Sequence, residues 1–328
     1  MTREIAGWNS SAAQVLFVHA VGVRMMPLLA NQAQQARYFR EVVTEGKRWG
    51  VAASETGKDV MDWSTRATRV EGGYILNGMK HFCTGTEDAD YVYVYAILDT
   101  AHSMFDGLLT VVVPKGTPGM LLHGDWDAMG QRQTSSGSIT FKDCFIADEH
   151  ILGLLGAQFS IRPSLWALYF QSAFNCLHMG MAEGALEVGF EYCKTTTRPW
   201  PSAQVEKAVQ DPYIQRTAGR LKALVAAARA LTDRSNEAAL LAERGLIPRG
   251  EGALRIAHAK VITTEVSLEV TSTLFEILGA RATYRKNAID RFWRSARTLT
   301  LHDPVQWKLQ EIGHFELSGE FPAETFYS

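Results

Sequence analysis

The sequence predicts an α+β protein in which a helical segment precedes a compact antiparallel β-domain, and a C-terminal four-helix bundle follows. Two observations carry this prediction. Apolar residues recur at helical spacing near both ends of the chain, whereas between about residues 52 and 150 they alternate with polar residues and are interrupted by glycine turns. We therefore expect a helical segment over residues 1–51, a β-domain over 52–153 and a bundle over 154–328.

The composition is typical of a soluble globular protein. The chain has 328 residues, of which 46% are hydrophobic and 21% charged, and its formal net charge of −2 argues against a nucleic-acid surface. The cysteines are widely spaced and form no cluster with histidines at zinc spacing, so we expect no metal site. We find no secretory signal and no apolar stretch of membrane-spanning length. The expected location is the cytoplasm, without a membrane partner.

The first 50 residues are predicted to be helical, with one apolar face before Pro27 and a second helical run from Leu28 to about Gly46. His19 lies on the apolar face of the first helix. A lone histidine on such a face is more often a core residue than a ligand. His19 is therefore a candidate substrate contact with a structural alternative.

Turn signals divide the β-domain into strands. The pairs Gly72-Gly73 and Asn77-Gly78 predict tight turns in an antiparallel meander, and Asn-Gly is among the strongest short hairpin signals. Tyrosines then alternate with small apolar residues over 91–96, which predicts one strand with two distinct faces. Further strands are expected over residues 108–113, 120–123 and 138–145.

Apolar stripes at helical spacing predict the long helices of the bundle. On the first stripe, Gly180 and Gly184 would let another helix approach closely, and the third stripe ends at Gly279, a natural helix stop. The segment from Pro304 is expected to supply the fourth helix. The stripes comprise Leu165, Leu168, Ser172, Met179, Ala182 and Leu186; Ile214, Ala218, Leu221, Val225 and Ala228; Val261, Leu268, Phe275 and Leu278; and Val305, Leu309 and Ile312.

The stretch over residues 297–308 is predicted to start this fourth helix. Asp303 can cap it, Pro304 suits its first turn, and Gln306 completes a capping box. His302 then lies just outside a helix N-terminus, whose partial positive charge favours a neutral imidazole that can accept a proton or bind a substrate oxygen. The alternative is a helix cap with an incidental histidine.

Helices, a β-domain and a four-helix bundle follow one another in the acyl-CoA dehydrogenase fold, and specific motifs strengthen the resemblance. Residues 78–90 resemble the strand and turn by which that superfamily holds the flavin ring. Residues 129–137, followed by Phe141, are similar to its second signature. Residues 197–200 and 278–281 lie where the family has flavin-phosphate and subunit-interface contacts. The resemblance covers nearly the whole chain.

The C-terminal stretch resembles one branch of this superfamily. Many acyl-CoA dehydrogenases carry a carboxylate base in a Tyr-Glu-Gly segment near the tail, whereas residues 300–305 have no carboxylate base at the comparable place. The tail is similar to the flavin-dependent monooxygenases, typified by dibenzothiophene monooxygenases and related sulfide and sulfone monooxygenases. Members that act on dibenzothiophene have a second histidine where this chain has Leu299. The resemblance implies O2, reduced FMN from a separate NAD(P)H:flavin reductase, and a homotetramer.

The resemblance also implies the roles of individual residues. A C4a-hydroperoxide on reduced FMN would oxygenate a small organosulfur or aromatic substrate, with His302 and Thr84 as catalytic residues. Trp126 is expected to contact both flavin and substrate, and Arg198 and Arg281 the flavin phosphate. The expected cofactor contacts are Phe82, Cys83, Thr84, Gly85, Trp126, Ser136, Arg198, Gly279, Ala280 and Arg281.

Alternatives stay open. Phe82 and Trp126 can be core side chains, and Arg198 can be a helix-end cation. The chain can also be an acyl-CoA dehydrogenase with FAD whose base is Glu265 or Glu269, or a non-enzymatic relative. The family usually has a longer helical N-terminal domain. Part of the pocket wall is therefore expected to be absent, to come from another subunit, or to be missing through a misassigned start.

Overall fold

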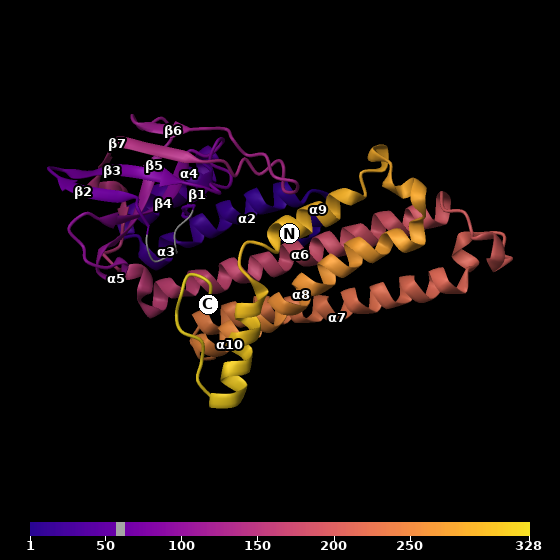
Figure 1. Ribbon diagram of the computed structural model, residues 1–328. Coiled ribbons are helices and arrows are strands. Elements are labelled where there is room, and N and C mark those ends of the chain that lie inside the picture. Colours follow the sequence, from indigo (N-terminus) through magenta and orange to yellow (C-terminus); the bar gives the residue numbers. More distant parts are fainter. Residues whose placement is uncertain (57–62) are drawn as a thin grey trace.

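The computed structural model describes residues 1–56 and 63–328. A sheet lies at one end of an elongated helical bundle, and the second helix of the chain runs along the bundle beside the sheet (Figure 1). The expected order of helices, sheet and bundle is confirmed. The N-terminal helices are α1 (Thr2–Trp8), α2 (Ser10–Arg24), α3 (Met26–Leu29) and α4 (Gln32–Glu45).

The described residues form an eight-stranded sheet in the order β6-β7-β3-β2-β4-β5-β8, with β1 also paired to β4. β1 and β2 run parallel to β4 and pair with its opposite ends, and the remaining pairs are antiparallel. The strands are β1 (Trp49–Ala52), β2 (Arg66–Val70), β3 (Gly73–Lys80), β4 (Tyr91–Leu98), β5 (Leu108–Pro114), β6 (Met120–Leu122), β7 (Ile139–Ala147) and β8 (Ile151–Leu152). A short helix, α5 (Met104–Gly107), lies between β4 and β5.

The predicted hairpin at Asn77-Gly78 is wrong. β3 continues through both residues, and its register with β7 shifts between Leu76 and Gly78, which marks a β-bulge. The Asn77 side chain accepts the backbone amide of Asp143 on β7 at 2.8 Å. Glycine is required at 78 because a Cβ there would lie 2.5 Å from Thr65 Oγ1. The Asn-Gly pair therefore marks a bulge within β3, at the point where the strand passes close to Thr65.

Two other strand predictions are confirmed. A tight turn at Glu71-Gly72 joins β2 to β3, within one residue of the predicted Gly72-Gly73 turn. On β4 the tyrosines belong to the core between sheet and helices, whereas Val92, Val94 and Ala96 belong to a core enclosed by the sheet. Both faces of β4 are thus buried, which gives the helices a firm surface to pack on.

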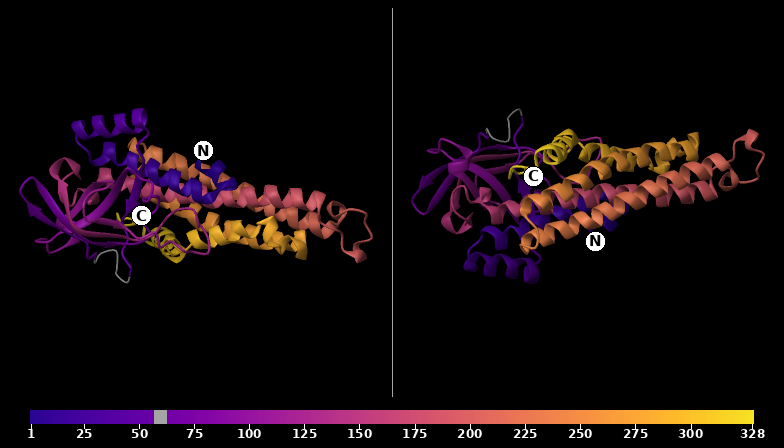
Figure 2. Two further views of the ribbon diagram at one scale, coloured as in Figure 1. Left: turned by 90° about the horizontal axis from the view of Figure 1, so that it is seen from above. Right: turned by 90° about the horizontal axis from the view of Figure 1, so that it is seen from below.

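The bundle consists of α6 (Ile161–Thr195), α7 (Pro212–Glu243), α8 (Arg249–Leu278) and α9 (Asp290–Leu299). The prediction that the segment from Pro304 is the fourth bundle helix is wrong. α9 takes that place and buries Phe292, Ala296 and Leu299. α10 (Val305–Ser318) buries Lys308 instead of its predicted apolar stripe, and it runs across the bundle axis (Figures 1 and 2).

The N-terminal helices pack closely on α6. A Cβ on Gly180 or Gly184 would lie 2.1 Å from a carbonyl oxygen of α1, so the predicted close approach of a helix at these glycines is confirmed. In contrast to the expectation from the sequence, Ser10–Leu29 is long and apolar enough to span a membrane by length and composition alone. In its apolar 18-residue window, 44% is buried inside the fold. Its Phe17 ring packs edge-on against Phe174 of α6, with centroids 5.2 Å apart.

Candidate functional site

Two loops at the edge of the sheet meet beside α2. Thr84 Oγ1, after β3, lies 2.8 Å from Ser136 Oγ, which lies 2.7 Å from Thr134 Oγ1. The Gln14 side chain donates to Thr84 at 3.3 Å, and Thr134 donates to the Gln131 carbonyl oxygen at 2.9 Å. Because each hydroxyl has one proton, the chain runs in one direction and Thr84 donates to Ser136. To donate to a ligand, Thr84 must give up that bond.

The backbone amides of residues 83–85 also have hydrogen-bond acceptors within the protein. Burial raises the pKa of the Cys83 thiol to about 12, so the thiol stays protonated inside the sheet. The amides that could meet a flavin edge already have acceptors, and a flavin contact through them requires those bonds to open. The amides of Cys83, Thr84 and Gly85 donate at 2.9, 3.0 and 2.9 Å to the carbonyl oxygens of Gly137, Phe82 and Thr134.

Phe82 gives this loop an exposed aromatic surface. It is 61% exposed, and its ring meets Trp126 edge to face with centroids 6.2 Å apart. The Trp126 indole donates to the Gln131 carbonyl oxygen at 2.8 Å, which holds the ring in place. The core alternative is therefore wrong for Phe82, and the pair forms an apolar wall open to a planar ligand.

The second loop is tied to α9. Arg294 donates to the Met129 carbonyl oxygen at 2.9 Å, and the Gln131 amide lies 3.4 Å from Ser295 Oγ. A Cβ on Gly130 would lie 2.1 Å from the Arg294 carbonyl oxygen, so glycine permits this contact. The loop is therefore held to the helix that leads directly to His302.

His302 lies in the turn between α9 and α10, and its side chain is 30% exposed. Its Nδ1 is 3.1 Å from Asp303 Oδ1. Its ring centroid is 4.4 Å from that of Phe174 and 5.4 Å from that of Phe170, both on α6. Because a carboxylate only accepts, the Nδ1 carries the proton and the Nε2 of a neutral ring is left as the acceptor.

Asp303 is not the helix cap that the sequence predicts. α10 begins after Pro304 without a side-chain cap bond, so the capping box with Gln306 does not form. Asp303 Oδ1 instead lies 2.9 Å from Nζ of Lys260 on α8, and both side chains are almost fully buried. Burial alone would raise the pKa of Asp303, but Lys260 and the bond to His302 lower it well below its usual range. His302 therefore has a carboxylate beside it that stays ionised.

Helix α2 touches both parts of the site. Gln14 reaches the Thr84 hydroxyl. One turn further, the Phe17 ring packs on Phe170 and Phe174, with centroids 5.4 and 5.2 Å apart. These are the rings on which His302 lies, so one helix face spans the distance from the loop hydroxyls to the imidazole.

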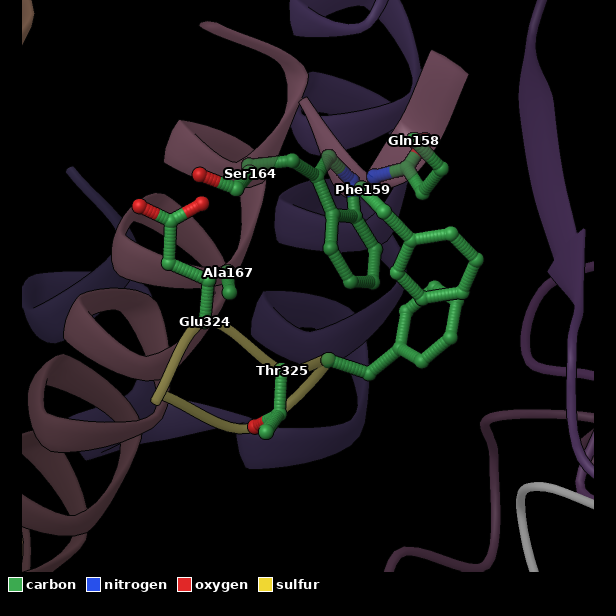
Figure 3. A pocket seen from close by; sticks show the side chains of 8 residues that line it. Gln158, Phe159, Ser164, Ala167, Glu324 and Thr325 are labelled. Atoms are coloured by element: carbon green, nitrogen blue, oxygen red, sulfur yellow. The ribbon is translucent and has the colours of Figure 1, made fainter. Parts of the chain in front are cut away.

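A small cavity lies at the junction of sheet and bundle. Glu324 and Thr325 of the C-terminal tail close one side of it, and Gln158 and Phe159 line another (Figure 3). Trp166 also lines it and stacks on Phe170 with centroids 4.7 Å apart. The cavity is therefore separated from His302 by two aromatic rings.

Comparison with known proteins identifies the family. The chain matches the acyl-CoA dehydrogenase middle domain at residues 49–144 and the acyl-CoA dehydrogenase C-terminal domain at residues 173–307. It is 34% identical to a dibenzothiophene monooxygenase of Rhodococcus erythropolis, over 100% of this chain and 81% of that protein. The chain belongs to the acyl-CoA dehydrogenase superfamily, in its flavin-dependent monooxygenase branch.

Two further relatives agree with this membership. This chain is 33% identical to the probable FMNH2-dependent monooxygenase SfnC of Pseudomonas putida, over 100% of this chain and 82% of that protein. The crystal structure of FMN-bound TdsC from Paenibacillus sp. A11-2 superposes with a TM-score of 0.93 at 36% identity, covering 100% of this chain and 84% of that one.

His19 has a structural partner in this monooxygenase. Its Nδ1 accepts the backbone amide of Trp49 at 3.2 Å, which ties α2 to β1. Burial and the nearby Arg48 lower the pKa of His19, so a neutral ring is favoured. The Nδ1 is thus occupied, and a substrate contact through the remaining nitrogen stays a prediction.

The predicted phosphate contacts lie far from the Thr84 loop. Arg281 donates to the Thr196 carbonyl oxygen at 2.8 Å, which places residues 279–281 beside the loop that carries the exposed Arg198. This loop is at the bundle end remote from the sheet (Figure 1). Along α6, Phe174 and Thr195 are about 30 Å apart at about 1.5 Å per residue. Within one chain, these arginines and Thr84 cannot contact the same small ligand.

The glutamates considered as a dehydrogenase base face elsewhere. Glu265 is exposed on α8. Glu269 forms an ion pair with Arg220 of α7. Neither position gives the His302 turn a free carboxylate, in agreement with the monooxygenase branch.

Proposed function

We propose that this monooxygenase takes reduced FMN from a separate NAD(P)H:flavin reductase and uses it with O2 to oxygenate a small organosulfur or aromatic substrate. The names of the relatives support this, since one is FMNH2-dependent, one is FMN-bound and one is named for dibenzothiophene. The observation that carries the proposal is His302, an imidazole on aromatic rings whose Nδ1 is held by an ionised carboxylate.

The flavin ring lies, in this proposal, against Phe82 and Trp126. These residues fit a planar cofactor because Phe82 presents an open ring surface and the hydroxyls of Thr84 and Ser136 lie beside it. Binding exchanges the bond from Thr84 to Ser136 for one to the flavin edge. Because that exchange replaces one neutral hydrogen bond by another, its net cost is small.

When bound, reduced FMN would supply the two electrons that activate O2, so that one oxygen atom passes to the substrate and the other leaves as water. His302 accepts or holds a proton at Nε2, since Asp303 fixes the other proton on Nδ1. Phe170 and Phe174 cover one side of the imidazole and shield that side from water. The tail residue Tyr327, with its ring centroid 5.9 Å from that of His302, covers another side.

The proposed assembly is a cytoplasmic homotetramer with the flavin at a subunit boundary. The remote position of Arg198 and Arg281 supports it, because these side chains can approach a flavin at Thr84 only from another copy of the chain. Sedimentation of the FMN-loaded protein tests this. A monomer that binds FMN as tightly in the Arg281→Ala variant as in the wild type would contradict the proposal.

The function is tested by supplying FMN, a flavin reductase, NADH and O2, and screening organosulfur compounds and acyl-CoAs by mass. We expect products that gain one oxygen atom from an organosulfur or aromatic compound such as dibenzothiophene. The control omits the monooxygenase, because free reduced FMN also reacts with O2. Loss of two hydrogens from an acyl-CoA, with no oxygen gained by any compound, would instead identify a dehydrogenase.

A further inference from the structure

Lys260 is a buried charge that the proposed oxygenation does not itself use. It lies on α8, is 1% exposed, and its Nζ is 2.9 Å from Asp303 Oδ1. The same carboxylate oxygen is 3.1 Å from His302 Nδ1. The other oxygen accepts the Gln171 side chain at 3.3 Å. One carboxylate thus joins α6 and α8 to the imidazole.

Phe174 is a second link between Lys260 and His302. The Lys260 ammonium lies 4.6 Å from the centroid of this ring, and the His302 ring is 4.4 Å from the same centroid. The imidazole and the ammonium therefore share both a carboxylate oxygen and an aromatic ring.

The positive charge of Lys260 offsets the negative charge of Asp303 beside the imidazole. A lone carboxylate next to a histidine favours the protonated ring, whereas an ammonium on the same carboxylate opposes it. From α6, burial lowers the pKa of His178 to about 3, so this neighbour is neutral. From α10, Lys308 is paired with Glu311 at 2.9 Å. From the tail, Tyr327 faces the ring.

We propose that Lys260 is a positioning residue, which fixes the Asp303 carboxylate so that this carboxylate holds His302 with a protonated Nδ1 and an open Nε2. The catalytic importance of His302 rests on the proposed function. The positioning itself is a property of the chain without flavin, so the two claims can fail separately.

The chain offers a matched control in Lys80. Lys80 is also fully buried, with Nζ 2.9 Å from Glu55 and 4.4 Å from the Trp63 ring centroid, but its carboxylate is bonded by Ser64 and Thr65 and not by a histidine. Lys80→Met and Lys260→Met therefore remove the same kind of ion pair. Any effect of an unpaired buried carboxylate on overall stability appears in both variants.

The test is the nitrogen NMR spectrum of histidine-labelled, flavin-free protein, which reports the proton on each ring nitrogen. The His302 signals are assigned by their loss in His302→Gln. In the wild type and in Lys80→Met we expect the neutral form of the His302 ring to carry its proton on Nδ1. In Lys260→Met we expect the titration midpoint of His302 to rise by about 1 pH unit or more, or the fixed tautomer to be lost.

Lys260→Gln serves if Lys260→Met does not fold, because its amide can still donate to Asp303 while carrying no charge. We expect the same direction of change, and a smaller one. The proposal is overturned if the tautomer and midpoint of His302 are the same in wild type and in the folded Lys260 variants. Retention of oxygenation by His302→Ala would remove the catalytic role proposed for His302 and leave this result standing.

Discussion

The two parts of the candidate site differ in how they are prepared for a ligand. Around Thr84, the hydroxyl and the neighbouring amides are committed to other protein groups. Around His302, the carboxylate of Asp303 occupies one ring nitrogen and leaves the other open. The loops around Thr84 (the loop part) must therefore exchange bonds when a ligand binds. The turn that carries His302 and Asp303 (the tail part) is already organised for one.

The supports of the two parts explain this difference. The Thr84 loops connect strands and are joined mainly by hydrogen bonds, which exchange readily with those of a ligand. His302 packs on aromatic rings of α6, and the neighbouring Asp303 is paired with the buried Lys260 of α8. Solvent offers no equivalent of these contacts.

Replacing Asp303 with Asn should have the largest effect, because it leaves Lys260 buried without its counter-charge. Removing one partner of a buried pair costs about 3–5 kcal/mol of unfolding free energy. Urea unfolding measures it. The control is Asp290→Asn, which breaks the exposed pair with Arg294 and should cost less than about 1 kcal/mol. Equal losses of unfolding free energy in the two variants would show that the buried Lys260–Asp303 pair does not support the tail part.

Acid should next weaken the scaffold beneath the loop part. Burial alone would raise the pKa of Glu55, but Lys80 and the bonds from Ser64 lower it to about 2. A lowered folded-state pKa means that the stabilisation is present above the unfolded value of 4.5 and is lost as pH falls towards about 2. Unfolding free energies of wild type and Glu55→Gln should therefore converge over this range. Curves that stay parallel would show that Glu55 is not the titrating group.

Paired substitutions in the hydroxyl chain test whether the loop part exchanges bonds. Thr84→Val removes the donor and should weaken FMN binding by at most about fivefold, the value of one hydrogen bond, because the bond to Ser136 is lost from the free protein as well. Ser136→Ala removes only the competing acceptor of Thr84, so FMN binding should be unchanged or tighter. Fluorescence titration of FMN measures both. Equal weakening in the two variants would mean that the chain acts as a fixed unit.

The smallest effect is expected at His19, on the helix that joins the two parts. An Asn side chain can still accept the Trp49 amide, so His19→Asn should cost about 1 kcal/mol of stability or less and leave the KM for substrate unchanged. Steady-state kinetics with an active organosulfur compound provide the measurement. A clear rise in KM with kcat retained would instead give His19 the substrate contact.

Local sequence patterns predicted most of the fold. Strand alternation at Tyr91 and Tyr93 and the glycines at 180 and 184 have direct counterparts in the packing, because periodicity reports which face is buried. Asn77-Gly78 misled because a bulge and a hairpin need the same backbone freedom. Only the neighbouring Thr65, which no local pattern reveals, distinguishes the two.

The site was harder to predict because the residues that contact His302 and Asp303 are distant from them in sequence. Asp303 has every local feature of a helix cap, yet the ion pair with Lys260 outweighs the cap once both are buried. A lysine within the apolar sequence of α8 was the available signal for that pair. Phe174 was one apolar residue among many, and its contact with His302 depends on how α9 ends.

The partition of oxygen between product and hydrogen peroxide in His302→Ala tests the catalytic role of the imidazole. With FMN, reductase, NADH and an accepted organosulfur substrate, we expect product per NADH to fall by about 10²–10⁴-fold while peroxide accounts for the oxygen consumed. The fold should persist, since His302 is partly exposed. Product yield equal to that of the wild type would contradict the role of this imidazole.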